Sequence, residues 1–306
     1  MDKFCFFVTA ILTANCATIS QAVLHVDQNL STDASSLLEF KSQVTSDPFR
    51  ILANWSSTTH VCNWIGVSCN LHQRITALKL SNWSLSGTVS PHLGNLTFLT
   101  LLDISFNSFS GFIPNELSNL HGLKLMDFGY NNFSGEIPSW FGTFIELELL
   151  LLDSNRFSGV IPVPLCNVSK LKRLNLNDNL LQGSIPQGIA NISYLRILNL
   201  RYNQLEGSIP SGIFNLTLLQ RIDLTRNSLS GNLPMDICNH PSKLQGLYLS
   251  YNHFEGEIPT QLYKCRYLEY LSLSYNQFNG KIPRTLGYLS QLKELYIGGN
   301  IFTGTY

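Results

Sequence analysis

The chain has 306 residues, and its 20 Lys and Arg residues balance 20 Asp and Glu residues, so the formal net charge at pH 7 is zero. Only 13% of the residues are charged, which is about half the usual share. A neutral chain has no long-range field to attract nucleic acid or an anionic membrane, so we expect no nucleic-acid partner.

The N-terminus has the features of an export signal. An apolar run over residues 4–12 follows the first three residues, and it is too short to cross a bilayer but long enough for the core of a signal peptide. The triplet at residues 20–22 has small residues at its first and third positions, so we expect a signal peptide over residues 1–22, with cleavage after Ala22. A buried apolar helix is the alternative. No later stretch reaches the ~18 apolar residues of a membrane span.

Residues 23–74 are expected to form an N-terminal cap for the array that follows. Four apolar residues can lie on one helix face: Leu37, Leu38, Phe40 and Val44. Trp55 and Trp64 supply bulk for the same cap. A cap is needed because the end of a repeat array otherwise exposes a row of leucines and a sheet edge.

Residues 75–306 contain ten repeats of 24 or 25 residues, of which the first is imperfect and the last incomplete. An asparagine recurs in nine of them: Asn107, Asn131, Asn155, Asn179, Asn203, Asn227, Asn252, Asn276 and Asn300. A Gly-x-Ile-Pro block recurs downstream, with Leu for Ile in one copy; its glycines are Gly111, Gly135, Gly159, Gly183, Gly207, Gly231, Gly256 and Gly280. Such a fixed period indicates a repeat architecture.

The repeat unit L-x-x-L-x-L-x-x-N predicts a short strand, because its leucines alternate with other residues. One unit cannot bury its own leucines, but units stacked ~4.8 Å apart form a parallel sheet with a continuous inner face. The repeated Asn can donate to and accept from the backbone where the strand turns. We therefore predict an α/β solenoid with a parallel sheet on the concave face and short strands and 3-10 or helical turns on the convex side.

The extended unit L-x-x-L-x-L-x-x-N-x-L-S-G-x-I-P resembles the plant-specific class of leucine-rich repeats. The preceding segment, with Cys-Asn-Trp-Ile-Gly-Val-Ser-Cys at residues 62–69, resembles the N-terminal cap of plant leucine-rich-repeat receptor kinases and receptor-like proteins. The repeats and the spacing of Cys238 and Cys265 look most like the receptor-kinase subfamily that includes immune receptors for bacterial ligands. The resemblance implies a curved superhelix and, in longer relatives, more repeats, a membrane helix and a kinase. Because Tyr306 falls one residue before the Pro expected in the tenth repeat, we expect a truncated, N-terminal part of such an ectodomain.

Five cysteines remain after the expected signal cleavage: Cys62, Cys69, Cys166, Cys238 and Cys265. In an oxidising compartment they pair by default, and one thiol is left over. We predict that Cys62 pairs with Cys69 and Cys238 with Cys265, which leaves Cys166 free. Cys166 and Cys238 lie three repeats apart, roughly 14 Å, which exceeds the ~7 Å limit between Cα atoms of a disulfide. Zinc at Cys62 and Cys69 is the alternative, although no further ligands accompany them.

The chain is rich in Asn-x-Ser/Thr glycosylation sequons, which agrees with export. The eight sequons begin at Asn29, Asn54, Asn82, Asn95, Asn132, Asn167, Asn191 and Asn215. Asn95, Asn167, Asn191 and Asn215 each precede a repeated asparagine position by twelve residues, so we expect glycans on the convex side.

No set of residues supports catalysis, and we expect neither an enzyme nor a bound metal or cofactor. The histidines show no metal-ligand spacing, and no nucleophile elbow or phosphate loop is present. Asp103 and Asp127 occupy equivalent positions on adjacent strands. Paired catalytic carboxylates are one interpretation, and an exposed ligand-facing or solvated pair is the other and the favoured one.

The outward positions of the concave strands are the best candidate binding surface. Carboxylates, arginines and aromatic residues gather there: Asp103, Asp127, Asp153, Arg173, Arg196, Arg201, Arg221, Arg226, Phe106, Tyr130, Tyr202, Tyr251 and Tyr275. Aromatic and Arg side chains bury much area with few rotors and can fork onto carboxylates. A solvated sheet face that only keeps the protein in solution is the alternative.

We therefore expect an extracellular recognition module that binds a peptide or protein ligand. The chain would be secreted, or held at the outer face of the plasma membrane if it is part of a longer receptor. The resemblance implies defence or development signalling, with a possible co-receptor as a further partner. The alternative is a free secreted protein similar to the polygalacturonase inhibitors of plant cell walls, which resemble a cap with two disulfides at each end.

Overall fold

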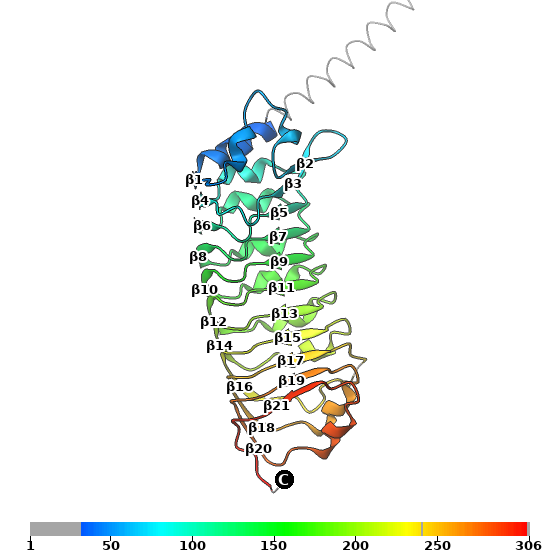
Figure 1. Ribbon diagram of the computed structural model, residues 1–306. Helices are drawn as coiled ribbons and strands as arrows, with labels where there is room; N and C mark the ends of the chain where they lie inside the picture. The colour runs from blue at the N-terminus through cyan, green and yellow to red at the C-terminus, as the bar shows by residue number, and fades with distance from the viewer. Residues whose placement is uncertain (1–31, 240, 305–306) are drawn as a thin grey trace, which may run out of the picture.

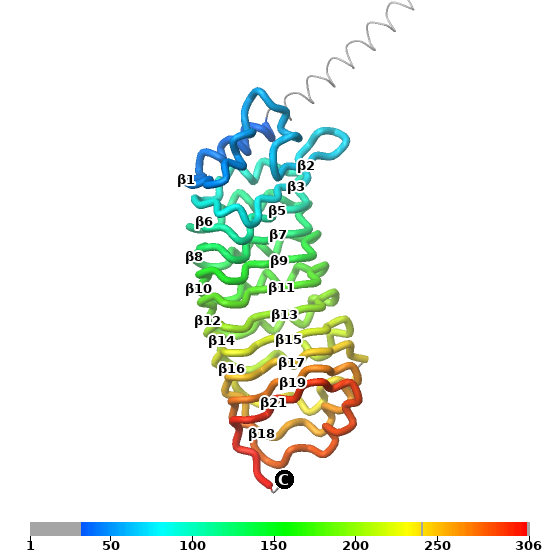
Figure 2. The backbone as a smooth tube through the Cα atoms, viewed as in Figure 1, coloured from blue at the N-terminus to red at the C-terminus, as the bar shows by residue number. Residues whose placement is uncertain are grey.

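The computed structural model describes residues 32–239 and 241–304, which form one elongated stack of chain turns (Figure 1). The backbone trace runs from the cap at one end to the last repeats at the other, with one turn laid beside the next (Figure 2). The predicted signal peptide and the sequon at Asn29 lie outside the described residues. Within the described ranges, no helix is long and apolar enough to cross a membrane.

The first sheet forms the concave face and receives one strand from each repeat. In the described part of the chain its order is β2-β3-β5-β7-β9-β11-β13-β15-β17-β19-β21. Neighbours from β3 onward pair in parallel, and β2 of the cap pairs antiparallel with β3. The strands are β2 (Val67–Cys69), β3 (Ile75–Lys79), β5 (Leu101–Asp103), β7 (Leu125–Asp127), β9 (Leu149–Leu151), β11 (Arg173–Asn175), β13 (Ile197–Asn199), β15 (Arg221–Asp223), β17 (Gly246–Tyr248), β19 (Tyr270–Ser272) and β21 (Glu294–Tyr296).

A second sheet forms where each repeat turns away from the first. Its order among the described residues is β1-β4-β6-β8-β10-β12-β14-β16-β18-β20, with β1 of the cap antiparallel to β4. The strands are β1 (Val44–Ser46), β4 (Ser86–Thr88), β6 (Ser108–Gly111), β8 (Asn132–Glu136), β10 (Arg156–Val160), β12 (Leu180–Ser184), β14 (Gln204–Gly207), β16 (Ser228–Asn232), β18 (His253–Glu257) and β20 (Gln277–Asn279). Each ends close to the glycine of the Gly-x-Ile-Pro block; Gly135, for example, has φ 87°, a conformation that favours Gly.

Short 3-10 helices complete the turns on the convex side. They are η1 (Ile51–Asn54), η2 (Val61–Asn63), η3 (Pro91–Asn95), η4 (Asn115–Asn119), η5 (Ser139–Thr143), η6 (Val163–Asn167), η7 (Gln187–Asn191), η8 (Ser211–Asn215), η9 (Thr260–Lys264) and η10 (Arg284–Tyr288). In most repeats the block proline precedes the helix directly, as Pro138 precedes η5, because proline has the required φ and needs no backbone partner. The expected solenoid, with a parallel concave sheet and 3-10 turns, is confirmed.

The repeated asparagines join each repeat to the one before it. The Nδ2 group of Asn155 donates to the carbonyls of Phe128, Leu152 and Asp153 at 2.9, 3.2 and 3.1 Å. Its Oδ1 accepts from the N–H of Phe133 at 2.9 Å. The same pattern recurs along the stack, so the asparagines satisfy backbone groups beside the core.

The cap differs from the predicted one in which side chains it buries. Residues 32–42 are helical, and Leu37 and Phe40 are fully buried against the first repeats. The prediction for Leu38 was wrong: it is 36% exposed, because it lies ~100° around the helix from Leu37. Val44 was also misplaced, since it belongs to strand β1 and not to the helix. Trp55 and Trp64 are buried and stacked, with ring centroids 5.4 Å apart, as expected of the bulk in the cap.

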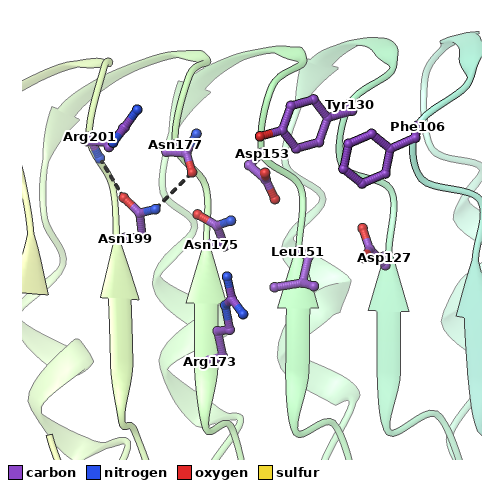
Figure 3. A pocket seen from close by; sticks show the side chains of 10 residues that line it. All are labelled: Phe106, Asp127, Tyr130, Leu151, Asp153, Arg173, Asn175, Asn177, Asn199 and Arg201. Atoms are coloured by element: carbon purple, nitrogen blue, oxygen red, sulfur yellow. Dashed lines mark hydrogen bonds between the residues drawn. The ribbon is translucent and has the colours of Figure 1, made fainter. Parts of the chain in front are cut away.

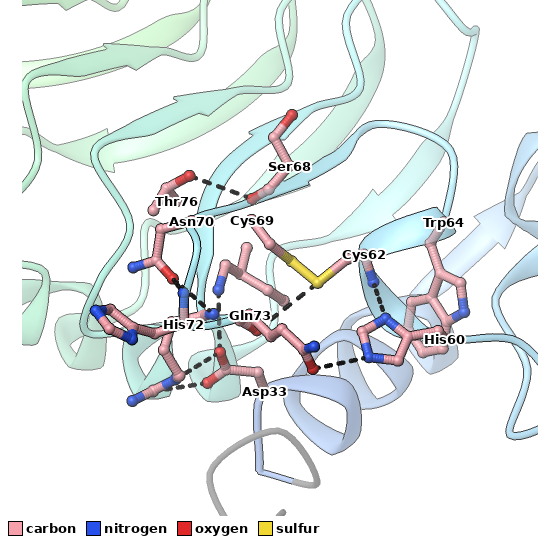
Figure 4. Close-up of a disulfide and its surroundings, with 12 residues drawn as sticks. Asp33, His60, Cys62, Trp64, Ser68, Cys69, Asn70, His72, Gln73 and Thr76 are labelled. Atoms are coloured by element: carbon pink, nitrogen blue, oxygen red, sulfur yellow. Dashed lines mark hydrogen bonds and ion pairs between the residues drawn. A yellow bond between two sulfur atoms is a disulfide. The ribbon is translucent and has the colours of Figure 1, made fainter. Parts of the chain in front are cut away.

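The two predicted disulfides are present. Cys62 and Cys69 are bonded at the edge of the cap (Figure 4), and Cys238 and Cys265 join neighbouring repeats. Cys166 is an unpaired, buried thiol, whose pKa is raised by burial. The alternative of zinc at Cys62 and Cys69 is therefore wrong.

Candidate functional site

The strands of the concave sheet point alternate side chains outward, which creates lanes of in-phase residues across the repeats. In β9 the side chain of Leu150 is buried, whereas Leu149 and Leu151 are partly exposed. The register continues this lane, because Asp103 pairs with Asp127 and Asp127 with Leu151. Residues 24 apart therefore lie side by side, about 4.8 Å from one another.

An open pocket of about 370 Å³ lies on this face between β7 and β13. We call it the polar pocket, and its lining residues are Phe106, Asp127, Tyr130, Leu151, Asp153, Arg173, Asn175, Asn177, Asn199 and Arg201 (Figure 3). Two carboxylates and two aromatic rings occupy one end, and the arginines come from the strands beyond (Figure 3). The pocket is thus polarised in charge along the stack.

The carboxylates at the acidic end of the polar pocket are hard to ionise. Burial raises the pKa of Asp127 from 3.8 to about 6, and the charges of Asp103 and Asp153 raise it further, against the N–H of Gly129 and the charge of Arg173. Burial likewise raises the pKa of Asp153, which is only 7% exposed. A positive group bound here would favour the charged forms of both carboxylates.

Aromatic rings line one edge of the concave sheet. Phe106 and Tyr130 are stacked with ring centroids 4.2 Å apart, and Tyr251 and Tyr275 are stacked at 4.4 Å. All four have left-handed φ values between 52° and 58°. These strained conformations recur because each backbone N–H donates to the next repeat, as Phe106 donates to the carbonyl of Gly129 at 2.9 Å.

Two of the predicted arginines connect to these rings. The guanidinium carbon of Arg226 lies 4.5 Å from the ring centroid of Tyr251 and 5.3 Å from that of Tyr202. The Arg201 guanidinium lies 4.9 Å from the Tyr202 ring. Rings and guanidinium groups therefore form one stiff, exposed ridge, which suits a binding surface because little side-chain freedom is lost on binding.

The structure places the predicted site residues in two groups. Phe106, Asp127, Tyr130, Asp153, Arg173 and Arg201 meet in the polar pocket. Tyr202, Arg226, Tyr251 and Tyr275 form the ridge on the following repeats.

Three predicted residues stand apart from both groups. Arg221 is paired with Asp223 at 3.2 Å and covers the Tyr248 ring. Arg196 precedes its strand and is exposed. Asp103 does not line the pocket, and its carboxylate accepts from the Ser105 hydroxyl at 2.7 Å.

Four lining residues were not predicted from the sequence: Leu151, Asn175, Asn177 and Asn199. They lie in the same two lanes as Asp127 and Asp153, so reading each lane across the repeats would have found them. Gly129, in the lane of Asp153, was missed for a different reason. A glycine gives no chemical signal in a sequence.

The predicted glycosylation positions leave the polar pocket open. Asn95, Asn167, Asn191 and Asn215 each end a 3-10 helix on the convex side, and all four are exposed. Of the remaining described sequons, Asn54 is part of the cap, Asn82 is exposed in the first repeat and Asn132 begins β8 of the second sheet. None of these seven asparagines lines the polar pocket.

Comparison with family models identifies the repeats and the cap. The model "Leucine rich repeat N-terminal domain" matches residues 30–70. Two models described as leucine rich repeat match residues 145–205 and 242–302, and residues 98–120, 122–144 and 218–240. Together the repeat matches cover more than half of the chain.

Among curated proteins, the chain is 47% identical over 74 residues to "LRR receptor-like serine/threonine-protein kinase EFR" from Arabidopsis thaliana. This match spans 24% of the chain and 7% of that protein. The chain thus matches a small part of the length of its curated relatives.

Solved structures of plant receptor ectodomains share the fold. One is the ectodomain of the Arabidopsis thaliana receptor kinase GASSHO1/SCHENGEN3 in complex with CASPARIAN STRIP INTEGRITY FACTOR 2, with 36% identity, a TM-score of 0.82, and coverage of 87% of this chain and 32% of that one. Another is the Arabidopsis receptor kinase HAESA ectodomain in complex with an IDA peptide hormone ligand, with 33% identity, a TM-score of 0.73, and coverage of 90% and 50%. A plant ice-binding protein has 28% identity, a TM-score of 0.80, and coverage of 90% and 88%.

The repeat period, the asparagine ladder, the cap and these matches agree. The chain belongs to the leucine-rich-repeat family, as a plant-type member similar to the ectodomains of plant receptor kinases.

Proposed function

We propose that the concave face binds an extracellular peptide or protein ligand, as part of a receptor of the leucine-rich-repeat type. The observation that carries this proposal is the concentration of exposed aromatic and arginine side chains on one face, beside a pocket with separate acidic and basic ends. Such residues dominate the energetics of protein interfaces. Two of the matched receptor ectodomains were solved in complex with a named ligand, which supports the same role here.

A ligand of irregular sequence fits this face better than a regular lattice. The lane along the ridge reads Phe106, Tyr130, Ser154, Asp178, Tyr202, Arg226, Tyr251 and Tyr275. Its residue type changes from repeat to repeat, so successive contacts differ in size and charge. This argues against transferring the activity named for the ice-binding neighbour.

The alternative of a free inhibitor of cell-wall enzymes is not favoured. Two matched solved structures are receptor ectodomains, and the described residues contain one disulfide in the cap and one in the repeats. We propose that the kinase and the co-receptor of a longer relative would transmit the binding event in defence or development signalling. The protein would act at the outer face of the plasma membrane or in the extracellular space.

A display library of random linear peptides, selected on the secreted glycoprotein, tests the proposal. Selected peptides are then measured against the parent and against a variant with Arg201→Glu and Arg226→Glu. For peptides that carry carboxylates, we expect binding to fall sharply, because like charges then face each other. Equal binding of all selected peptides to the parent and the variant would remove this surface as the ligand site.

A further inference from the structure

The acidic end of the polar pocket contains an unfilled space between two carboxylates. A Cβ atom added at Gly129 would lie 3.2 Å from Oδ1 of Asp127 and 3.0 Å from Oδ1 of Asp153. Gly129 is not among the residues with positive φ, so its backbone conformation does not require glycine. The effect of a glycine at this position is to leave room between the two carboxylates.

The acceptors around this space outnumber the donors. The only side-chain hydrogen bond to Asp127 in the described structure comes from the N–H of Gly129 at 3.0 Å. None of the ion pairs among the described residues includes Asp127 or Asp153. Asn175, which is 5% exposed and lines the same pocket, has an Oδ1 atom with no hydrogen-bond partner. Buried polar groups are nearly always paired, so these acceptors point to a donor that comes from a ligand.

The aromatic pair borders the same space. Figure 3 places the rings of Phe106 and Tyr130 beside Asp127 and Asp153, at the end of the pocket away from Arg201. Phe106 is 52% exposed and Tyr130 is 48% exposed, so a ligand can reach both rings. Aromatic rings attract cations through the negative charge of their faces, and they also contact the apolar stem of a long side chain.

The geometry points to the guanidinium group of an arginine side chain as the ligand of this space. A guanidinium has five N–H donors in one plane and can donate to two carboxylates and an amide oxygen at once, whereas an ammonium group has three donors around a point. It also stacks on aromatic rings and is more weakly hydrated than an ammonium. We name the space between Asp127 and Asp153 the guanidinium subsite.

The basic end of the pocket adds a second requirement for the ligand. Arg173 and Arg201 belong to β11 and to the loop after β13, which are two and three strands from β7, or about 10 to 14 Å. An extended peptide advances ~3.3 Å per residue. The ligand is therefore a segment with an arginine and, roughly three or four residues along, a carboxylate. This inference rests on the proposed function, because it names the ligand chemistry of the same concave face.

Small probes test the guanidinium subsite without knowledge of the natural ligand. Binding of Nα-acetyl-arginine amide to the full chain is followed by NMR titration and compared with the lysine and citrulline amides. Citrulline has the shape of arginine without its charge. We expect saturable binding of the arginine probe, at least about tenfold weaker binding of the lysine probe, and none of citrulline. Equal binding of the arginine and citrulline probes would overturn the inference.

Three variants locate the probe. Gly129→Ala fills the space and keeps every charge, and Asp127→Asn removes one charge and keeps the shape. Asp178→Asn is the matched control, because it removes an exposed carboxylate on the same face that does not line the pocket. We expect the first two to weaken arginine binding by at least about tenfold and the control to leave it unchanged. Thermal unfolding checks that each variant folds, and Asp127→Asn keeps the test valid if Gly129→Ala does not.

The peptides selected on the concave face separate this inference from the proposed function. Each arginine in a selected peptide is replaced by citrulline, and the peptide is measured against the parent and Asp127→Asn. Loss of affinity on citrulline substitution that disappears in Asp127→Asn supports the subsite. Peptides that bind the concave face without any dependence on arginine or Asp127 would overturn the subsite and leave the proposed function standing. Probe binding without any peptide or protein ligand would overturn the proposed function.

Discussion

The carboxylate of Asp33 accepts two hydrogen bonds from the guanidinium of Arg74, at 3.0 Å from Nε and 2.9 Å from Nη2. It also accepts from the N–H of Ile75 at 3.2 Å, at the start of the first repeat strand β3. Asp33 lies in the cap helix and its side chain is only 1% exposed. One buried carboxylate therefore fastens the cap to the repeats (Figure 4).

Replacing Asp33 with Ala should destabilise the protein markedly. The substitution leaves the Arg74 charge and the Ile75 N–H without their partner, and removal of one member of a buried pair costs about 3 to 5 kcal/mol. Chemical unfolding monitored by circular dichroism measures the change. Glu146→Ala is the control, because its partner Lys170 is 49% exposed, and exposed pairs contribute about 1 kcal/mol or less. Equal losses in the two variants would contradict the role assigned to Asp33.

The asparagine ladder should matter for folding and the arginines for binding. Replacing Asn179 and Asn203 with Ala should lower the free energy of unfolding by about 1 to 3 kcal/mol for each buried group left unpaired. Replacing Arg201 and Arg226 with Glu changes outward side chains, so we expect a shift of about 0.5 kcal/mol or less. Thermal and denaturant unfolding of both double variants tests the contrast. A larger loss of stability in the arginine variant would contradict it.

Asp127 should make stability depend on pH near neutrality. Its pKa in the folded protein is about 6, above the ordinary 3.8, so the folded state holds a proton that the unfolded state has lost. The stabilisation is complete below about pH 3.8 and is lost as the pH rises through 6.

Asp127→Asn, which resembles the protonated side chain, should then be more stable than the parent at pH 7.5 and equal to it at pH 3.5. Paired unfolding curves at the two pH values measure this difference. A difference that is the same at both pH values would show that Asp127 does not titrate as described.

The repeats could be predicted from the sequence because their signals are local and recur every 24 residues. Leucine alternation predicts the concave strands, and the positions of Asn107, Gly135 and Pro138 predict the ladder, the turn and the start of a 3-10 helix. The cap has no period to average over. One helix turn was therefore assigned to the wrong face at Leu38.

The polar pocket could be predicted only in part. Asp127 and Asp153 are 26 residues apart, which is not a multiple of the period, so they lie in different lanes. What brings them together is the lack of a side chain at Gly129. The left-handed conformations of Phe106 and Tyr130 were also not predicted, because they depend on hydrogen bonds to the following repeat rather than on the local sequence.

Glycans are expected on the convex side at Asn95, Asn167, Asn191 and Asn215. Each is exposed at the end of a 3-10 helix, so an attached glycan meets solvent and leaves the concave sheet free. Glycopeptide mass spectrometry of protein secreted from plant cells measures occupancy. Four unoccupied sites in a secreted protein would contradict this assignment.

A glycan placed on the concave face tests the central claim most directly. Arg201→Thr converts Asn199-Leu200-Arg201 into an Asn-x-Thr sequon, and Asn199 lines the polar pocket. Arg201→Ala removes the same arginine without creating a sequon, and occupancy of Asn199 is verified by mass spectrometry. The measurement is the affinity of selected concave-face peptides for both variants, before and after enzymatic removal of glycans. We predict that the glycosylated Arg201→Thr protein loses binding, that Arg201→Ala retains more of it, and that deglycosylation restores the difference; unchanged binding to the glycosylated protein would contradict ligand recognition on this face.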